Sequence, residues 1–163
     1  MSYRSTDRIC DFEFHDSRIE FVSFENANLT ITAKALNIHQ NTEQNSYDTD
    51  MQCSAATITF INAVIGFYTD GITYKCINGE FVPESEEAVV YTDKLAEALF
   101  LKEAKHGFEI YGVKEKMQGN YKVFEFDAGG IAPFFSCGIY YESVEISWDS
   151  FEGKAWYEEK KEK

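Results

Sequence analysis

Carboxylates and aromatic rings share one segment near the end of the sequence. Glu145, Trp148 and Asp149 lie there, and the same segment holds Glu142, Glu152, Tyr140, Tyr141, Phe151, Trp156 and Tyr157. Glycosidases and sugar-binding sandwiches combine such residues, and glycoside hydrolysis needs two carboxyl groups about 5.5 Å or about 6.5 to 9.5 Å apart. Glu145 and Asp149 share a strand face if that strand continues through residue 149. The alternative is structural, with Trp148 packing in the core or at an edge and the acids on the wet face.

The three histidines, His15, His39 and His106, are far apart in the sequence. His15 adjoins Asp16 at the end of an expected first strand, where an Asp often accepts backbone N–H bonds that shape a turn. We expect this structural role, with catalysis as the alternative. His39 is expected in a loop, and His106 as a cation near a helix C-terminus. The candidate functional cluster is His15, Asp16, Glu145, Trp148 and Asp149.

The chain lacks the usual catalytic and cofactor signatures. It has no GxGxxG after a strand, no Walker loop, no GxSxG elbow and no HExxH. Asp48-x-Asp50 lacks the glycine and the distal glutamate of an EF-hand loop, so it predicts a solvated loop. We expect no metal, no cofactor and no enzymatic activity.

Negative charge is concentrated in one stretch. The chain has a formal net charge of −13, of which residues 41–93 carry −8. Such a field disfavours nucleic acid and anionic membranes and favours encounter with a basic protein, although excess charge also simply keeps proteins soluble. The candidate acidic docking face is Asp48, Asp50, Glu84, Glu86 and Glu87.

Cysteine usage and hydropathy indicate the compartment. Cys10, Cys53, Cys76 and Cys137 form no CxxC pair, and no run of 18 apolar residues exists. The amino terminus has no apolar segment behind its charges. We expect four free thiols in a cytoplasmic protein without a membrane span.

Hydrophobic periodicity predicts strands for most of the chain. Apolar residues alternate with polar ones in segments such as 29–35, 57–60 and 143–149. Turn dipeptides at Asp70-Gly71 and Asn78-Gly79 predict a meander over 55–83. The sequence therefore predicts a mainly β fold (or α+β with little α) of at least seven strands, as an antiparallel sandwich or a barrel-like sheet, within a single domain, 1–163.

One segment follows a helical pattern instead. Leu95/Leu99 and Ala96/Phe100 recur at i,i+4, Lys105 and His106 suit the last turn, and Gly107 marks the stop, which predicts a helix near 93–106. The polar stretch 39–52 predicts an exposed loop, and 158–163 a frayed tail.

The segment Phe14-His15-Asp16-Ser17, followed by a strand over 19–24 and another over 29–35, resembles the opening of a family of small bacterial β-rich proteins. These proteins begin with Phe-His-Asp-Ala/Ser, and some are classed as immunity proteins to polymorphic toxins. The resemblance covers about 30 of the 163 residues. It implies a non-enzymatic protein that blocks a toxin, and it carries over no binding residues.

Two classes of function remain. One is a binding module whose acidic face meets a basic protein, with aromatic side chains as anchors. The other is a β-domain that binds a small ligand, or binds or hydrolyses a carbohydrate, in an aromatic-lined pocket. Convergent carboxylates in a pocket favour the second class, and an exposed acidic patch without one favours the first.

Overall fold

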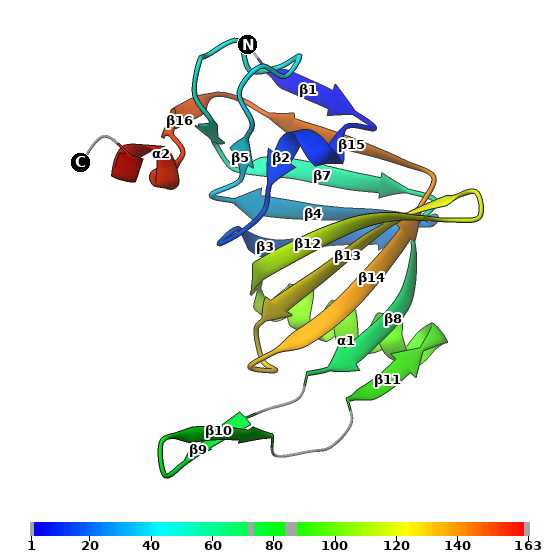
Figure 1. Ribbon diagram of the computed structural model, residues 1–163. Coiled ribbons are helices and arrows are strands. Elements are labelled where there is room, and N and C mark those ends of the chain that lie inside the picture. Colours follow the sequence, from blue (N-terminus) through cyan, green and yellow to red (C-terminus); the bar gives the residue numbers. More distant parts are fainter. Residues whose placement is uncertain (1, 72–73, 84–87, 162–163) are drawn as a thin grey trace.

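A ten-stranded sheet forms the body of the molecule (Figure 1). The computed structural model describes residues 2–71, 74–83 and 88–161. In spatial order the strands are β1 (Tyr3–Thr6), β15 (Ser143–Trp148), β7 (Ala56–Ile61), β4 (Asn28–Lys34), β3 (Arg18–Glu25), β12 (Phe108–Gln118), β13 (Tyr121–Gly129), β14 (Phe135–Tyr141), β8 (Val64–Asp70) and β11 (Val89–Thr92). All pairings between neighbours are antiparallel. The prediction of a mainly β, antiparallel fold is confirmed.

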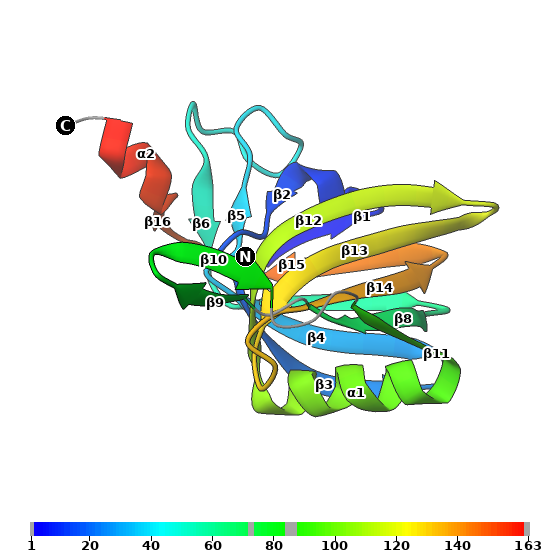
Figure 2. The ribbon, with the colours of Figure 1, turned by 60° about the horizontal axis from the view of Figure 1, so that its bottom comes forward.

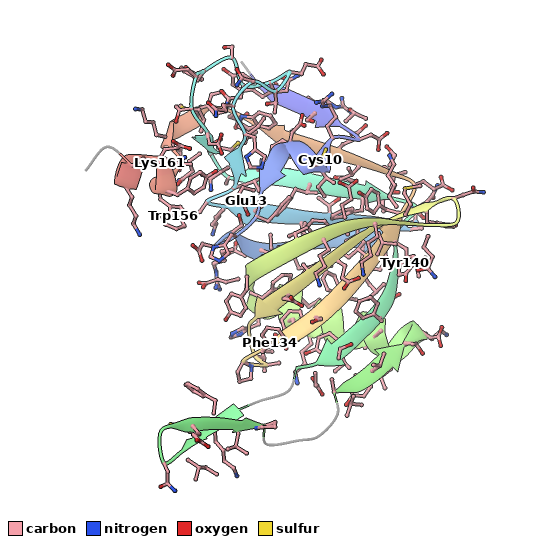
Figure 3. The ribbon with its side chains drawn as sticks, viewed as in Figure 1. Cys10, Glu13, Phe134, Tyr140, Trp156 and Lys161 are labelled. Carbon is pink, nitrogen blue, oxygen red and sulfur yellow. The ribbon has the colours of Figure 1, made fainter. Side chains whose placement is uncertain are left out.

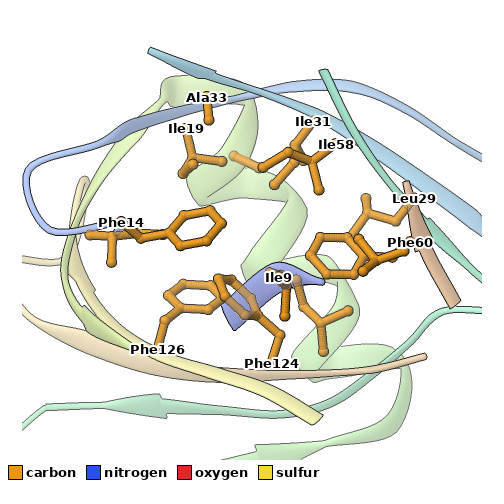
Figure 4. Packing of buried hydrophobic residues seen from close by; sticks show 14 of the residues in the cluster. Ile9, Phe14, Ile19, Leu29, Ile31, Ala33, Ile58, Phe60, Phe124 and Phe126 are labelled. Carbon is orange, nitrogen blue, oxygen red and sulfur yellow. The ribbon is translucent and has the colours of Figure 1, made fainter. Parts of the chain in front are cut away.

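The sheet bends where β3 meets β12, and its two halves face each other like the layers of a sandwich. β3 and β12 pair only at Phe108 with Ile19 and at Glu109 with Arg18. Phe124 of β13 contacts Phe60 of β7, with ring centroids 5.6 Å apart, so side chains from both halves share one core (Figure 4). This core forms because β4, β7, β13 and β15 alternate apolar and polar residues and bury one face each.

The helix α1 (Asp93–His106) lies against β3, β8 and β11 and so spans both halves of the sheet (Figure 2). Its bounds agree with the predicted helix 93–106, and Gly107 ends it with a φ of 88°. Phe100 points into the core, where its ring lies 6.2 Å from that of Phe108. Glu103 is also buried and accepts hydrogen bonds from Tyr68 Oη and from the backbone N–H groups of residues 131 and 132.

A smaller sheet packs over one end of the body. Its strands are β16 (Phe151–Lys154), β6 (Met51–Cys53), β5 (Asn37–Ile38) and β2 (Phe12–Glu13). The 3-10 turn η1 (Ile9–Asp11) precedes β2, and the helix α2 (Trp156–Lys161) follows β16. Phe12, Ile38 and Met51 are buried in the common core, which fixes this sheet against the large one.

The predictions for 55–83 and for 39–52 are both wrong. The predicted meander over 55–83 fails because β7 pairs with β4 and β15, whereas β8 crosses to the other half and pairs with β14 and β11. Within the described residues of 55–83, the hairpin that forms is that of β9 (Tyr74–Ile77) and β10 (Glu80–Pro83), around Asn78-Gly79 with positive φ at both residues. The stretch 39–52 is not an exposed loop throughout, because Asn45 is buried and donates to the carbonyls of Ile38 and Thr49.

The helix α2 includes residues 158–161 of the predicted tail. The Tyr157 hydroxyl and the Ala155 N–H group both donate to Asp50 and hold the start of this helix. Residues 162 and 163 lie outside the described residues.

Aromatic rings cover several glycines of the sheet. A Cβ atom at Gly66 would collide with the ring of Tyr140, and one at Gly138 would collide with the ring of Phe67. These rings fill the space that a side chain at the glycine would take, so each pair packs as one unit.

All four cysteines are free thiols, as expected. Cys53 and Cys137 are buried, and Cys10 and Cys76 are exposed. Among the described residues, no helix has the length and apolar character needed to cross a membrane.

Candidate functional site

The structure divides the predicted cluster between two places. Glu145, Trp148 and Asp149 line a cavity of about 440 Å³ on β1, β7 and β15, whereas His15 lines a separate groove. Trp148 is buried and its ring stacks on that of Tyr3 at a centroid distance of 5.3 Å. β15 ends at Trp148, so Asp149 lies just beyond the strand, although it lines the same cavity as Glu145.

The cavity on β1, β7 and β15 is polar. Glu145 forms an ion pair of 2.5 Å with Arg4, and hydroxyl groups of Thr57, Thr59 and Ser147 line the remainder. The Arg4 guanidinium neutralises the one carboxylate that lies within the strand, so this cavity lacks a pair of free carboxylates. It offers hydrogen bonds to a neutral polar ligand.

A second and larger site gathers the chemistry-bearing side chains of three elements. This groove has a volume of about 580 Å³ and lies between the small sheet, β12 and α2. Glu13 and Trp156 approach it from β2 and α2, and they lie close to each other in Figure 3. The lining residues are Glu13, His15, His39, Asp50, Tyr111, Gly112, Val113, Trp156 and Tyr157.

Asp50 is the centre of a hydrogen-bond network in the groove. It is 8% exposed, and its Oδ2 accepts from Tyr157 Oη at 2.7 Å and lies 3.0 Å from His39 Nδ1. Its Oδ1 accepts the backbone N–H of Gln40 at 2.8 Å. Burial opposes ionisation, but the hydrogen bonds from His39, Gln40 and Tyr157 outweigh it, so the pKa of Asp50 is lowered. Asp50 is therefore an anion whose oxygens are already bonded.

The same network holds the wall formed by α2. Burial and the hydrogen bond to Asp50 raise the pKa of Tyr157, which keeps its hydroxyl protonated as a donor. The N–H of Ala155 donates to the Asp50 carbonyl at 2.9 Å, just before the helix begins. Asp50 therefore holds α2 through both its side chain and its backbone carbonyl.

Glu13 and His15 form the wall nearest β2. Glu13 Oε1 accepts the backbone N–H of His15 at 2.8 Å. His15 Nδ1 lies 3.0 Å from Asp16 Oδ2, and Asp16 has a φ of 67°, which places it in a tight turn as expected. Asp16 N–H donates to the Ile110 carbonyl at 2.9 Å, so this turn is tied to β12.

The aromatic rings of the groove face cations from their own chain. Lys160 Nζ lies 4.6 Å from the centroid of the Trp156 ring, and Lys161 Nζ lies 6.0 Å from that of Tyr157. Across the groove, the Tyr111 side chain is 43% exposed. These rings combine apolar area with a surface that attracts positive charge.

Gly112 leaves the groove open on the β12 side. It follows a register shift in the pairing with β13, and a Cβ atom there would meet no atom within 4 Å. A larger side chain at this position would therefore extend into open space.

Of the predicted acidic docking face, the structure describes only Asp48 and Asp50. Asp48 is exposed, but Asp50, only two residues away, is buried and bonded within the groove because His39 and Tyr157 cover it. Glu84, Glu86 and Glu87 lie outside the described residues. No group of His, Cys, Asp or Glu in the described part of the chain is arranged to hold a metal ion.

His39, Tyr111 and Glu13 line the groove, although the sequence did not single them out as site residues. His39 was expected as a plain loop residue, although it shares the polar stretch with Asp50, and that shared stretch was the one available signal. Tyr111 and Glu13 sit in short strand-like segments that nothing in the sequence links to α2. Comparisons with protein-family models, with curated proteins and with solved structures found no match.

Proposed function

We propose that this protein is a non-enzymatic module that docks a basic protein, in the manner of the immunity proteins that its amino-terminal hairpin resembles. The observation that carries the proposal is the groove, in which the carboxylates of Glu13 and Asp50 lie with the aromatic side chains of Tyr111, Trp156 and Tyr157. Aromatic residues dominate the binding energy of many interfaces, and carboxylates select a cationic partner.

The two carboxylates have different parts in this proposal. The Asp50 carboxylate is hydrogen-bonded to His39, Gln40 and Tyr157, so it holds the walls of the groove in place and adds negative potential. Glu13 is less constrained, because its Oε1 accepts one backbone N–H and its Oε2 accepts none among the described residues. Glu13 is therefore the direct contact for a positive group. The net charge of −13 adds long-range attraction that accelerates the encounter.

The second class of function, binding of a small neutral ligand or a carbohydrate, rests on the other cavity. Its hydroxyls from Thr57, Thr59 and Ser147 and its volume of about 440 Å³ suit a polar, uncharged ligand. Arg4 neutralises Glu145 and leaves Asp149 as the other carboxylate of this cavity, so we place the docking of a basic protein in the groove, where Glu13 and Asp50 lie among aromatic residues.

Two glycine substitutions provide the experiment. Gly112→Leu obstructs the groove, and Gly153→Leu is its matched control, because Gly153 also lies in a strand at a register shift with open space around its Cβ position. Each protein is immobilised and incubated with a lysate of its source cells at about 50 mM and about 500 mM salt.

The proposal expects wild-type protein and Gly153→Leu to retain a protein of high isoelectric point at low salt, and Gly112→Leu to lose it. High salt should weaken the retention, because charges on the rim act through screened, long-range attraction. Retention of no basic protein, or equal retention by both variants, overturns the proposal.

A further inference from the structure

We infer that the groove binds an arginine side chain, whose guanidinium group pairs with Glu13 and packs against the aromatic walls. This inference rests on the proposed function and names the part of the basic partner that enters the groove. It is supported by the free carboxylate oxygen of Glu13, the aromatic rings of the groove and the open side of the groove at Gly112.

The carboxylate of Glu13 is the group that would pair with the guanidinium. Among the described residues no side-chain cation pairs with Glu13, whereas Glu125 and Glu145 each pair with one and Glu20 pairs with two. Glu13 is partly buried at the mouth of the groove, and Asp50 lies in the same lining. A positive group entering here meets one free carboxylate and the potential of a second.

The aromatic residues of the groove would pack against the same cation. Lys160 places its ammonium group 4.6 Å from the centroid of the Trp156 ring, so this ring already lies beside a positive charge, as cation–π packing requires. Tyr111 lines the β12 side of the groove and is 43% exposed, and its ring stacks on that of Phe134 with centroids 6.3 Å apart. A cation that enters the groove therefore lies among the aromatic residues Trp156, Tyr157 and Tyr111.

Arginine suits this groove better than lysine does. A guanidinium group is planar, is weakly hydrated, stacks on aromatic faces and pairs with a carboxylate through two parallel N–H bonds. An ammonium group is compact and holds its water more strongly. Walls of aromatic rings with a single free carboxylate match the first of these groups.

The experiment uses three small probes with isotope-labelled protein. Acetyl-arginine amide is titrated and followed by the NMR shifts of the Tyr111, Gly112 and Val113 amides and of the Trp156 indole N–H. Only Trp148 and Trp156 give indole signals, and Trp156→Phe assigns them. Acetyl-citrulline amide is the uncharged probe of the same shape, and acetyl-lysine amide carries an ammonium group.

The arginine probe should bind at least about tenfold more tightly than the citrulline probe, and also more tightly than the lysine probe. Glu13→Gln should weaken its binding by about threefold to tenfold, and Gly112→Leu should abolish it, while Gly153→Leu leaves it unchanged. The Trp148 indole signal should not move, because that ring is buried away from the groove.

Equal affinity for arginine and citrulline, or shifts that persist in Gly112→Leu, overturns the inference. Equal affinity for arginine and lysine overturns the choice of guanidinium. If a basic protein is still captured through the groove while the arginine probe fails to bind, the inference falls and the proposed function stands. If Gly112→Leu also fails to alter capture, both fall.

Discussion

At the scale of single residues, the Asp50 side chain connects three parts of the groove. One carboxylate receives bonds from the loop through Gln40, from His39 and from α2 through Tyr157. Each bond to a buried charge contributes more than a neutral one, and removing the charge leaves the donors without a matched acceptor. The residue is thus a structural centre as well as a source of negative potential.

We predict that Asp50→Asn lowers the free energy of unfolding at pH 7 by about 1.5 to 3 kcal/mol, the usual value of hydrogen bonds to a charged group. Because the pKa of Asp50 is lowered in the folded protein, its contribution is complete above the unfolded value near 3.8 and is lost as the pH falls below it. Urea denaturation of both proteins between pH 7 and pH 3 measures this.

The control for that prediction is Asp48→Asn, two residues away on the exposed part of the same loop. It should change stability by no more than about 0.5 kcal/mol. A difference between wild-type protein and Asp50→Asn that stays constant down to pH 3 would show that the charge of Asp50 is not what the network uses.

The four thiols provide a second prediction at this scale. Burial raises the pKa of Cys53 to about 12 and raises that of Cys137 as well, whereas Cys10 and Cys76 are exposed. Titration with a thiol reagent at pH 8 should modify two groups quickly in native protein and four after denaturation. Four fast groups would contradict the burial of Cys53 and Cys137.

At residue scale the sequence could predict little of the groove. Asp16 lies in a turn as expected, but the carboxylate that accepts a backbone N–H there is that of Glu13, and Asp16 Oδ2 lies beside His15 Nδ1 instead. The pairing of His39 with Asp50 and Tyr157 depends on the path of a loop and on where α2 docks. Neither leaves a periodic pattern in the sequence.

At the scale of elements, α1 is fixed to the sheet by a buried acid. Glu103 accepts bonds from Tyr68 Oη at 3.1 Å and from the N–H groups of Ile131 and Ala132 at 2.7 and 3.0 Å. The loop after β13 is therefore held by the helix, and a Cβ atom at Gly130 would collide with the Glu103 carboxylate at 2.5 Å.

We predict that Glu103→Gln lowers the free energy of unfolding by about 1 to 3 kcal/mol, because its amide NH₂ group would oppose a buried donor. Chemical denaturation measures the loss, and hydrogen exchange at Ile131 and Ala132 should accelerate with it. Glu97→Gln, on the exposed face of the same helix, is the control and should be neutral. Unchanged exchange at residues 131 and 132 would refute this role of Glu103.

The helix α2 offers the second prediction at this scale. It has six residues, too few to be stable alone, and the Tyr157 hydroxyl bond to Asp50 of 2.7 Å anchors it. Tyr157→Phe removes about 1 kcal/mol from that anchor, so trypsin should cleave after Lys160 about fivefold faster. Tyr121→Phe, on an exposed strand end, should leave the cleavage rate unchanged. Equal rates for both variants would show that α2 is held by other contacts.

Elements were predictable where a pattern is long. The 14 residues of α1 carry an i,i+4 stripe and a terminal glycine, so the predicted bounds agree with the observed ones. β2 and β5 have two residues each, too short for alternation to show, and they form because the core buries Phe12 and Ile38. The small sheet is thus a product of tertiary packing.

At the scale of the whole molecule, one core joins the two halves of the bent sheet. Phe124 contacts Phe14, Phe60 and Phe126. Strand content and antiparallel pairing follow from alternation, but the bend between β3 and β12 does not, because alternation indicates which face of a strand is buried and not which strand lies beside it. The order of strands across the bend was therefore out of reach of the sequence.

We predict that Phe124→Ala lowers the free energy of unfolding by about 3 to 5 kcal/mol and that the molecule still unfolds in one transition. Far-UV circular dichroism and the fluorescence of Trp148, which lies in the opposite half, should report the same midpoint. Phe81→Ala is the control, because Phe81 is 78% exposed on the β9–β10 hairpin and should cost no more than about 0.5 kcal/mol. Separate midpoints from the two probes would mean that the halves fold independently.

The pairing of glycines with aromatic rings restricts how this sequence can change. Gly66 lies under Tyr140 and Gly138 under Phe67, and in each pair the two residues belong to adjacent strands, β8 and β14. A mutation that enlarges either glycine requires its ring to leave, and loss of either ring exposes bare backbone. In a random mutant library selected for folding, these positions should therefore accept substitutions in pairs, with a smaller residue replacing the ring whenever a larger one replaces the glycine.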